Sequence, residues 1–336
     1  MRLGLTIPYT DQVPRQVLVA FASEADRLGY DRLWVPEAYG WDAFTTLAQL
    51  AGVTSRIGLG TGIVNVFSRS PALLGQSAAA LDDLSGGRFV LGLGTSGPKV
   101  VSGWHGVPYE RGIARLRETV QIVRKVVARE RLTHDGEVFR LDAGLKLTTH
   151  PRRAAIPVYL ATLSPAGIAL AGEIADGWLP VFFSPGRYAS AIRPHLVRGA
   201  EAAGRDLSTL SICPYQTVVV TGDRGAGRDA ARPQLALYLG GMGTREKNYY
   251  NALWRAYGYE EEARRIQDLY LAGERVAATR AVTDRMVDEV TVIGSAGECR
   301  ERLAALEEVG VTELAIAVTV PGNDPAEVLR ALRDLA

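Results

Sequence analysis

The chain has 336 residues, 47% of them hydrophobic and 22% charged, so it has enough apolar side chains to form a sizeable core. Its 38 basic and 37 acidic residues give a net charge of +1 without a basic stripe, which argues against nucleic acid as a partner. The two cysteines, Cys213 and Cys299, are far apart and form no CxxC, which excludes a disulfide framework or a zinc ribbon.

The first residues, MRLGLTIPYTDQ, lack the apolar run and small-residue cleavage site of a secretory signal. No stretch reaches the ~18 consecutive apolar residues that a membrane span requires. We therefore expect a soluble, cytoplasmic protein with no membrane partner.

One unit recurs along the chain: an amphipathic helix, a glycine, and then a short apolar run. Such helices are expected over 17–28, 72–84, 166–175 and 300–309, with a further helix over 113–127. Strands are expected at 2–7, 31–35, 56–60, 88–93, 157–161, 177–182, 209–220 and 312–319. Most are near-continuous apolar runs, as in a parallel sheet that is covered on both faces. Strands alternating with helices favour a (β/α)8 TIM barrel, formed by 1–336 as a single domain, over an open doubly wound sheet.

Residues 221–290 interrupt this alternation. A polar loop leads into a long helical region rich in charges and aromatic residues, which we interpret as a helical insertion before the last strand. It is a candidate lid or dimer surface, although helix packing also explains its aromatic side chains. We expect this insertion and the 97–112 loop to line the substrate pocket.

Residues 92–97, GLGTSG, follow a predicted strand and match the GxGxxG pattern of dinucleotide-binding folds. Pro98 stands where the following helix should be running, and Glu118 lies inside a predicted helix instead of closing a second strand. The glycines are better explained as positions where backbone approaches a ligand closely.

Barrel enzymes place their chemistry at the carboxyl ends of the strands. In this sequence those ends carry Glu37, Asn65, the pair Thr95-Ser96, and Thr162 with Ser164. Taken singly, Glu37 also fits a rim carboxylate and Asn65 a turn former. Ser164 before Pro165 is a good helix start, which suits either an ordinary N-cap or a bound phosphate.

None of the four histidines has the spacing of metal ligands, so no metal site is expected. His105 lies in the loop after the fourth strand and is the best general acid or base among them. A hydrogen-bonded loop histidine explains the same residue.

At these strand ends the sequence resembles the luciferase-like monooxygenase superfamily, in its branch of oxidoreductases that depend on the deazaflavin coenzyme F420. The segments that carry the resemblance are LGYDRLWVPEAYGWDAF, RIGLGTGIVNVFSRSPA, LDDLSGGRFVLGLGTSGP, VYLATLSPAGIALAGEIADGWLP and TVIGSAGECRERLAALEEVGVTELAIAV. They cover most of the chain outside the insertion.

The resemblance implies coenzyme contacts residue by residue. It places Glu37 against the deazaflavin, and a bulge with a non-prolyl cis peptide at Gly62–Ile63, near Asn65, behind the ring. Such a bond costs ~3–4 kcal/mol and needs packing to hold it. The remaining matching positions are Thr95 and Ser96 after the fourth strand, and Leu163, Ser164, Ala166 and Gly167 in the phosphate-binding turn after the fifth.

The sequence also departs from its relatives. F420-dependent sugar-phosphate dehydrogenases carry a histidine and a glutamate where this chain has Ala38 and Gly97, so their proton relay is missing. The histidine pair of the luciferases is replaced by Ala38-Tyr39, which weakens an FMN-dependent reaction.

We therefore expect an F420-dependent oxidoreductase that transfers hydride to or from a small organic substrate, and a homodimer. Tyr39 and His105 are the candidate proton donors or acceptors, and Trp41 and Trp104 are the candidate substrate contacts. The alternatives are an FMN-dependent monooxygenase and a coenzyme carrier without turnover, with a Rossmann dehydrogenase last.

Overall fold

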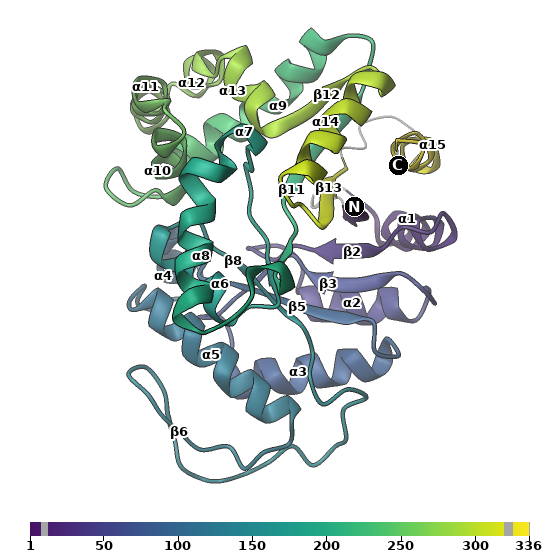
Figure 1. The fold of residues 1–336 in the computed structure, drawn as a ribbon, viewed down its shortest axis with the longest axis vertical. Helices are drawn as coiled ribbons and strands as arrows, with labels where there is room; N and C mark the ends of the chain where they lie inside the picture. Colours follow the sequence, from purple (N-terminus) through teal and green to yellow (C-terminus); the bar gives the residue numbers. More distant parts are fainter. Residues whose placement is uncertain (8–12, 319–324, 336) are drawn as a thin grey trace.

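Parallel strands form the centre of the structure, with helices around them (Figure 1). The computed structural model describes residues 1–7, 13–318 and 325–335. Strands of the main sheet follow the order β10-β9-β8-β5-β3-β2-β1-β13-β11-β12, and β4 pairs with β5. Their bounds are β1 Arg2–Thr6, β2 Arg32–Val35, β3 Gly58–Thr61, β4 Val64–Asn65, β5 Phe89–Gly94, β8 Val158–Ala161, β9 Gly177–Trp178, β10 Ser211–Ile212, β11 Tyr215–Val220, β12 Thr291–Gly294 and β13 Glu313–Ala317.

The sheet closes into a barrel because β10 and β11 are consecutive segments of the chain. β10, at one end of the strand order, pairs with β9, while β11 pairs with β13 near the other end, so this stretch of chain brings the two sides of the sheet together. Backbone bonds from Thr312 N to Ile212 O (3.0 Å) and from Ala315 N to Pro214 O (2.9 Å) bridge the break. The strand expected over 209–220 is thus divided at Pro214, which has no N–H to donate. The predicted barrel is confirmed.

Helices surround the barrel. The bounds are α1 Arg15–Arg27, α2 Ala43–Ala51, α3 Pro71–Leu84, α4 Pro98–Gly103, α5 Gly112–Val127, α6 Pro165–Ile174, α7 Pro185–Arg187, α8 Arg193–Ala202, α9 Arg224–Gly241, α10 Tyr249–Ala256, α11 Glu260–Leu271, α12 Arg275–Ala281, α13 Asp284–Val290, α14 Ala296–Glu308 and α15 Pro325–Arg333. Helix α3 packs on α5, α6 on α8, and α9 on α11. A small antiparallel hairpin, β6 (His134–Asp135) with β7 (Arg140–Leu141), lies between α5 and β8 and was not predicted.

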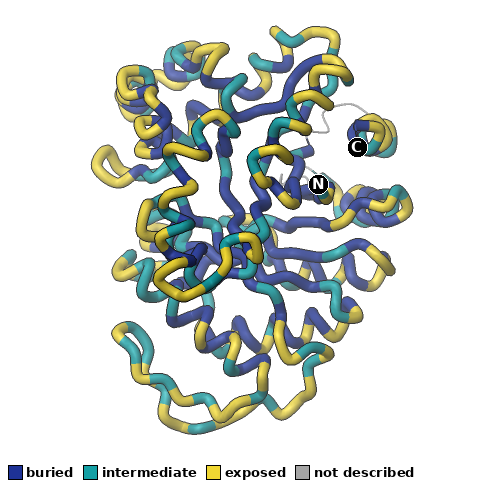
Figure 2. The backbone as a smooth tube through the Cα atoms, in the orientation of Figure 1, coloured by how far each residue is buried: buried dark blue, intermediate teal, exposed yellow. Residues whose placement is uncertain are grey.

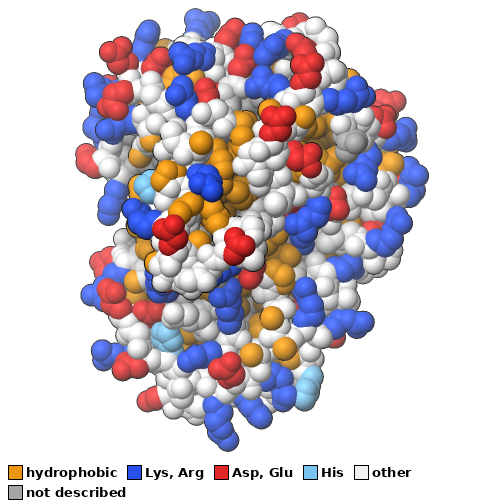
Figure 3. All heavy atoms as spheres, viewed as in Figure 1, with side chains coloured by type: hydrophobic (Ala, Val, Ile, Leu, Met, Phe, Trp, Pro, Cys, Tyr) orange, Lys and Arg blue, Asp and Glu red, His pale blue; other side chains and the backbone are white. Residues whose placement is uncertain are grey.

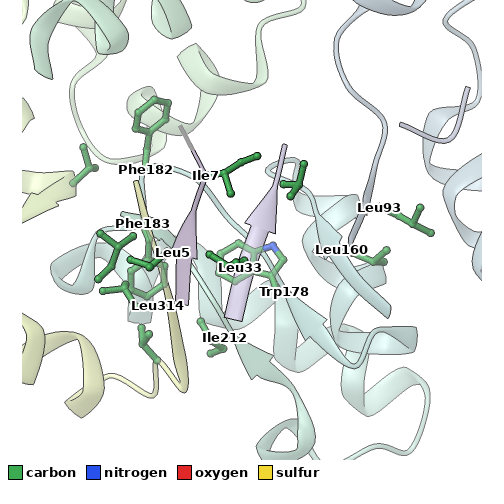
Figure 4. Packing of buried hydrophobic residues seen from close by; sticks show 14 of the residues in the cluster. Leu5, Ile7, Leu33, Leu93, Leu160, Trp178, Phe182, Phe183, Ile212 and Leu314 are labelled. Carbon is green, nitrogen blue, oxygen red and sulfur yellow. The ribbon is translucent and has the colours of Figure 1, made fainter. Parts of the chain in front are cut away.

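The strands bury both of their faces, as their apolar sequences predict. On β2, Trp34 belongs to a small cluster inside the barrel, whereas Leu33 and Val35 belong to the large cluster between the barrel and its helices. Figure 4 shows members of the large cluster, with Leu33, Leu5 and Leu314 coming from three neighbouring strands. Exposed residues lie mainly on the outer helices and on the long connection that carries β6 and β7 (Figure 2).

Helix starts and ends follow the local sequence. Ser70 caps α3 and Ser164 caps α6, each followed by proline at the first helical position. Gly310 ends α14 with φ at 97°, as expected of a glycine after a helix. Gly177 is the glycine after the helix predicted over 166–175, but it begins β9, where a Cβ would lie 2.6 Å from the Tyr159 ring. This position requires glycine because a side chain would collide with Tyr159, and not because the chain turns there.

Residues 221–290 form five helices, α9 to α13, at one end of the molecule (Figure 1). Trp254, Tyr257 and Tyr259 are buried, and Trp254 and Tyr257 contact Phe182, which lies outside the insertion. The insertion precedes the last predicted strand, as expected, and β12 and α14 lie between it and β13.

Three further observations bear on the sequence predictions. Among the described residues, none of the helices has the length and apolar character needed to cross a membrane. Basic and acidic side chains are interspersed over the face shown in Figure 3. The last predicted strand is confirmed as far as Ala317, and its residue 319 lies outside the described residues.

Candidate active site

A cavity of about 390 Å³ lies where strand ends of the barrel face the insertion. The strand ends and the turns after them contribute Pro36, Glu37, Ala38, Gly62, Ile63, Thr95, Ser96, Ala161, Thr162, Leu163 and Ser164. The loop before α5 and the insertion contribute Gly97, Tyr109, Arg111, Gln234, Leu235, Tyr238, Met242, Lys247, Tyr249 and Tyr250. Both segments expected to line a pocket therefore do so.

The structure brings most of the predicted coenzyme residues together. Seven of the ten line the cavity: Glu37, Gly62, Ile63, Thr95, Ser96, Leu163 and Ser164. Asn65 is buried and does not line it, and Ala166 and Gly167 lie in the first turn of α6 without lining it. Contact between these residues and a coenzyme stays a prediction.

Glu37 is held by Arg69, a residue that the sequence reasoning missed. The guanidinium donates to both carboxylate oxygens, at 2.7 and 2.8 Å, and the Ala43 amide donates to one of them at 2.8 Å. Arg69 also contacts Asp42. Burial acts to lower the pKa of Arg69, but hydrogen bonds and charges from the two carboxylates outweigh it and raise that pKa. The carboxylate of Glu37 is thus fixed in position and its charge is compensated.

A bulge forms after β3, as predicted. Gly60 pairs with Val90 and Val64 pairs with Leu93, so three residues on one side oppose two on the other. Every described peptide bond is trans, including Gly62–Ile63, so the predicted cis peptide is wrong.

Residues with a left-handed backbone conformation are concentrated at the cavity. Only four non-glycine residues in the described ranges have positive φ, and three of them line it: Ser96 at 55°, Arg111 at 50° and Phe182 at 54°. Such conformations cost free energy and persist where surrounding structure imposes them, often at functional sites. Their clustering supports a functional role for the cavity.

The first turn of α6 offers a site for an anion. The Ser164 hydroxyl accepts from the Gly167 amide at 3.1 Å, and the Ser164 carbonyl accepts from Ile168. Pro165 has no N–H, and the Gly167 amide donates to the cap. The Ala166 amide is therefore the N–H of this turn that the cap does not use. Partial positive charge at a helix start favours a phosphate there. The structure confirms the predicted N-cap, which leaves room for both interpretations of this turn.

The predicted catalytic and substrate residues lie elsewhere. The buried Asn65 amide and His105 Nε2 are 3.3 Å apart, and neither residue lines the cavity. Tyr39, Trp41 and Trp104 are 62%, 59% and 66% exposed, and the rings of Tyr39 and Trp104 are 6.4 Å apart. The structure pairs Tyr39 with Trp104, sets Trp41 against Arg15 and His105 against Asn65, and brings none of the four to the cavity, so their roles stay predictions.

Tyrosines that no motif marked form part of the cavity wall. Tyr109 donates to Ser96 O at 3.1 Å and contacts Thr95 Oγ1 at 3.2 Å, which ties its loop to the end of β5. Tyr238 comes from α9, whereas Tyr215 lies on β11. The aromatic content of the insertion was the only signal in the sequence, and it did not separate packing tyrosines from those of the cavity.

Three buried polar atoms of cavity residues have no hydrogen-bond partner among the described residues: Thr162 Oγ1, Tyr215 Oη and Gln216 Oε1. Each unsatisfied buried group costs about 1–3 kcal/mol, which a ligand with complementary polar atoms can recover. The described residues contain no cluster of histidine, cysteine and carboxylate side chains that could hold a metal ion. The cavity therefore suits an organic molecule with polar groups.

Sequence comparisons place the chain among known proteins. Residues 1–313 match the profile of the family described as Luciferase-like monooxygenase. The chain is 38% identical over 329 residues to a Mycobacterium tuberculosis protein whose name proposes a coenzyme F420-dependent oxidoreductase, with 94% of each chain covered. It is 30% identical over 315 residues to the 5,10-methylenetetrahydromethanopterin reductase of Archaeoglobus fulgidus, with 94% of this chain and 92% of that one covered.

Solved structures share the fold. The coenzyme F420 dependent tetrahydromethanopterin reductase of Methanopyrus kandleri aligns with a TM-score of 0.84 at 21% identity, covering 99% of this chain and 97% of that one. An F420-dependent secondary alcohol dehydrogenase in complex with an F420-acetone adduct aligns at 0.82 and 18%, covering 100% and 98%. An FMN complex, the oxygenating constituent of 3,6-diketocamphane monooxygenase from Pseudomonas putida, aligns at 0.70 and 21%, covering 99% and 96%.

The profile covers most of the chain, and the relatives extend over nearly all of it. The chain therefore belongs to the luciferase-like monooxygenase family, as an oxidoreductase grouped with the F420-dependent reductases.

Proposed function

We propose that this protein binds coenzyme F420 in the cavity and transfers hydride between it and a small organic substrate. The observation that carries the proposal is the convergence of Glu37, the Gly62–Ile63 bulge, Thr95 and Ser164 around one cavity. The F420-dependent relatives support the choice of coenzyme.

The residues present fit such a coenzyme. The bulge and the fixed carboxylate of Glu37 offer a backbone surface and a polar edge for the tricyclic ring. The α6 start, with Ser164, would hold the phosphate of the side chain. Thr162, the residue before this turn, has an unsatisfied hydroxyl oxygen that a polar ligand could complete.

The bound coenzyme would supply a ring carbon that gives or accepts hydride. The protein's own contribution is positioning and electrostatics. Arg69 fixes Glu37 by two hydrogen bonds, so the polar edge of the cavity is set before a ligand arrives. Tyr109 links the 97–112 loop to Ser96 and thereby keeps one wall in place.

The residues that line the cavity also argue against sugar phosphates as substrates. Ala38 and Gly97 line it at the positions where related sugar-phosphate dehydrogenases carry their relay histidine and glutamate. An alanine and a glycine cannot exchange protons, so we do not assign this protein to sugar-phosphate oxidation. FMN-dependent oxygenation is the alternative, because FMN enzymes share the fold.

Titrating the purified protein with F420 and with FMN, followed by ligand fluorescence, tests the proposal. Two serine N-caps provide a matched pair of variants: Ser164 at the cavity and Ser295 at the start of α14. Losing either cap costs about 1 kcal/mol of stability. Ser164→Ala is expected to weaken F420 binding about tenfold, through one charge-assisted hydrogen bond, and Ser295→Ala to leave it unchanged.

Tight FMN binding with oxygen consumption, and no binding of F420, would replace the proposal by the alternative. Equal affinities of the two serine variants for F420 would remove the phosphate site from α6.

A further inference from the structure

The cavity has a positively charged rim. Three of its described lining residues are charged, namely Glu37, Arg111 and Lys247. Glu37 is nearly buried and paired with Arg69, so its charge is compensated inside the protein. Arg111 and Lys247 are exposed, and the reaction proposed above gives neither of them a role. The charge that remains at the rim is that of these two basic side chains.

Neither cation has a strong partner in the protein. Within the described ranges, the Lys247 ammonium group forms no ion pair. Arg111 meets Glu137 at 3.3 Å, but these side chains are 58% and 60% exposed, and an ion pair in that setting contributes little. Glu110 and Glu246, which precede the two cations in the sequence, do not line the cavity. An anion at this rim would therefore be attracted without displacing a strong protein contact.

The two cations come from different segments that meet at the cavity. Arg111 is two residues after Tyr109 in the loop before α5, and Lys247 is two residues before Tyr249 at the start of α10. The phenol groups of Tyr109 and Tyr249 interact with each other. Arg111 and Lys247 are thus close to the same tyrosine contact, where one flexible anion can reach both.

This rim lies beside the proposed phosphate site. Helices α5 and α6 both start at the cavity, where Gly112 and Ser164 line it. Arg117 of α5 pairs with Glu173 of α6, so the two helices are neighbours. Arg117 is six residues after Arg111 and Glu173 is nine after Ser164, so at a rise of about 1.5 Å per residue the two starts are level to within about one turn. With packed helix axes about 10 Å apart, Arg111 stands roughly 10 Å from Ser164.

We propose that Arg111 and Lys247 bind carboxylates of the oligoglutamate tail of coenzyme F420. This inference rests on the proposed function, which puts the phosphate of the coenzyme at Ser164. Beyond that phosphate, F420 continues through a lactyl group into glutamates joined by their γ-carboxyl groups, and each glutamate keeps a free α-carboxylate. An extended chain covers more than about 3 Å per residue, so the first few glutamates span the distance from Ser164 to the rim.

The rim suits such a tail in the sign of its charge and in its exposure. Carboxylates that pair with exposed cations keep most of their water, so the pairing avoids the cost of burying an ion. Each exposed pair is expected to strengthen binding about twofold to fivefold, and two pairs together about tenfold. Because both cations stay in contact with solvent, salt should screen this attraction.

Another cation near the same phosphate site provides the matched control. The Arg198 side chain on α8 donates to Pro165 O at 3.5 Å, at the start of α6, but it is exposed and does not line the cavity. A tail that left outward over α8 would meet this single arginine. The rim offers two cations, and the start of α5, which has no side-chain cap, adds partial positive charge there. We therefore expect the tail at the rim and not at α8.

The test compares F420 that carries no glutamate with F420 that carries several. Fluorescence titration of the unaltered protein at low salt is expected to show the long-tailed form binding about tenfold tighter. In about 1 M NaCl, where the Debye length is about 3 Å, the two forms should bind equally.

Glutamine substitutions remove the charge of each cation and keep much of its side-chain length. Lys247→Gln is expected to weaken binding of the long-tailed form about threefold, and Lys247→Gln combined with Arg111→Gln to reduce it to the affinity of the form without glutamates. Neither change should alter the affinity for that shorter form. Arg198→Gln should keep the full preference for the long tail.

The outcomes separate this inference from the proposed function. Equal affinities for the two forms at low salt would overturn the inference and leave the coenzyme assignment standing. A preference that persists at high salt or in the double variant, or that Arg198→Gln abolishes, would overturn it as well. Failure of both forms to bind would overturn the proposed function, and the inference with it. The comparison at low and high salt uses the unaltered protein, so it decides the matter even if a variant does not fold.

Discussion

Replacing Gly92 by alanine is expected to destabilise the barrel strongly. A Cβ at this position would lie 2.0 Å from the carbonyl oxygen of Thr61 on the neighbouring strand. The two residues are also linked by two hydrogen bonds, from Gly92 N to Thr61 Oγ1 at 2.7 Å and from Thr61 Oγ1 to Gly92 O at 2.8 Å. Strand β5 must move away from β3 to admit the methyl group, which breaks both bonds.

The expected loss is about 2–6 kcal/mol, from overpacking and two broken buried hydrogen bonds. Gly97 in the same motif is the matched control, because its nearest neighbour to a Cβ is Met242 O at 3.4 Å and its φ is −115°. Gly97→Ala should change the stability by less than about 1 kcal/mol, because the smaller conformational entropy of alanine in the unfolded chain offsets the preference for glycine at this N-cap of α4.

Urea unfolding followed by circular dichroism, with the slope m checked for equality, measures both changes. Equal stabilities for Gly92→Ala and Gly97→Ala would refute this account of the motif. The predicted difference would show that close strand packing, and not a dinucleotide, explains the first glycine of GxGxxG.

Three further predictions concern charged groups. Arg69→Met leaves Glu37 nearly buried without its counter-charge and should cost about 3 kcal/mol in urea unfolding, part of which Arg69→Lys restores. Burial acts to raise the pKa of Asp26, but hydrogen bonds from the amides of residues 55–57 outweigh it and lower that pKa. This stabilisation is present above the unfolded pKa of about 3.9 and is lost as pH falls through the folded value, so Asp26→Asn should destabilise at pH 7 and much less near pH 3. Glu313 is fully buried between two arginines, and Glu313→Ala should cost about 3–5 kcal/mol, measured by thermal unfolding.

The barrel was predictable because its strands bury both faces. Runs such as RFVLGLG, followed by stretches with helical periodicity, specify parallel strands and covering helices without any long-range information. Parallel strands of a barrel have their carboxyl ends at one rim. Glu37, Thr95 and Ser164, which follow such ends, could therefore be predicted to lie close together. The structure brings all three to one cavity.

What could not be predicted depends on contacts between distant residues. Arg69 lies in the turn before α3 and donates to Glu37, which is distant in the sequence. No local pattern distinguishes this arginine from a surface arginine. The split of the seventh strand at Pro214 is visible as a proline, but its effect depends on the partners of β10 and β11. His105 was selected for its chemistry and its place after the fourth strand, and tertiary structure places it against Asn65.

The central claim is that the cavity between the strand ends and the insertion is a coenzyme site. A crystal structure of the protein with F420 tests it most directly. We expect density for the tricyclic ring beside the Gly62–Ile63 bulge and for the phosphate at Ser164. Coenzyme bound elsewhere, or an empty cavity at saturating F420, would contradict the claim.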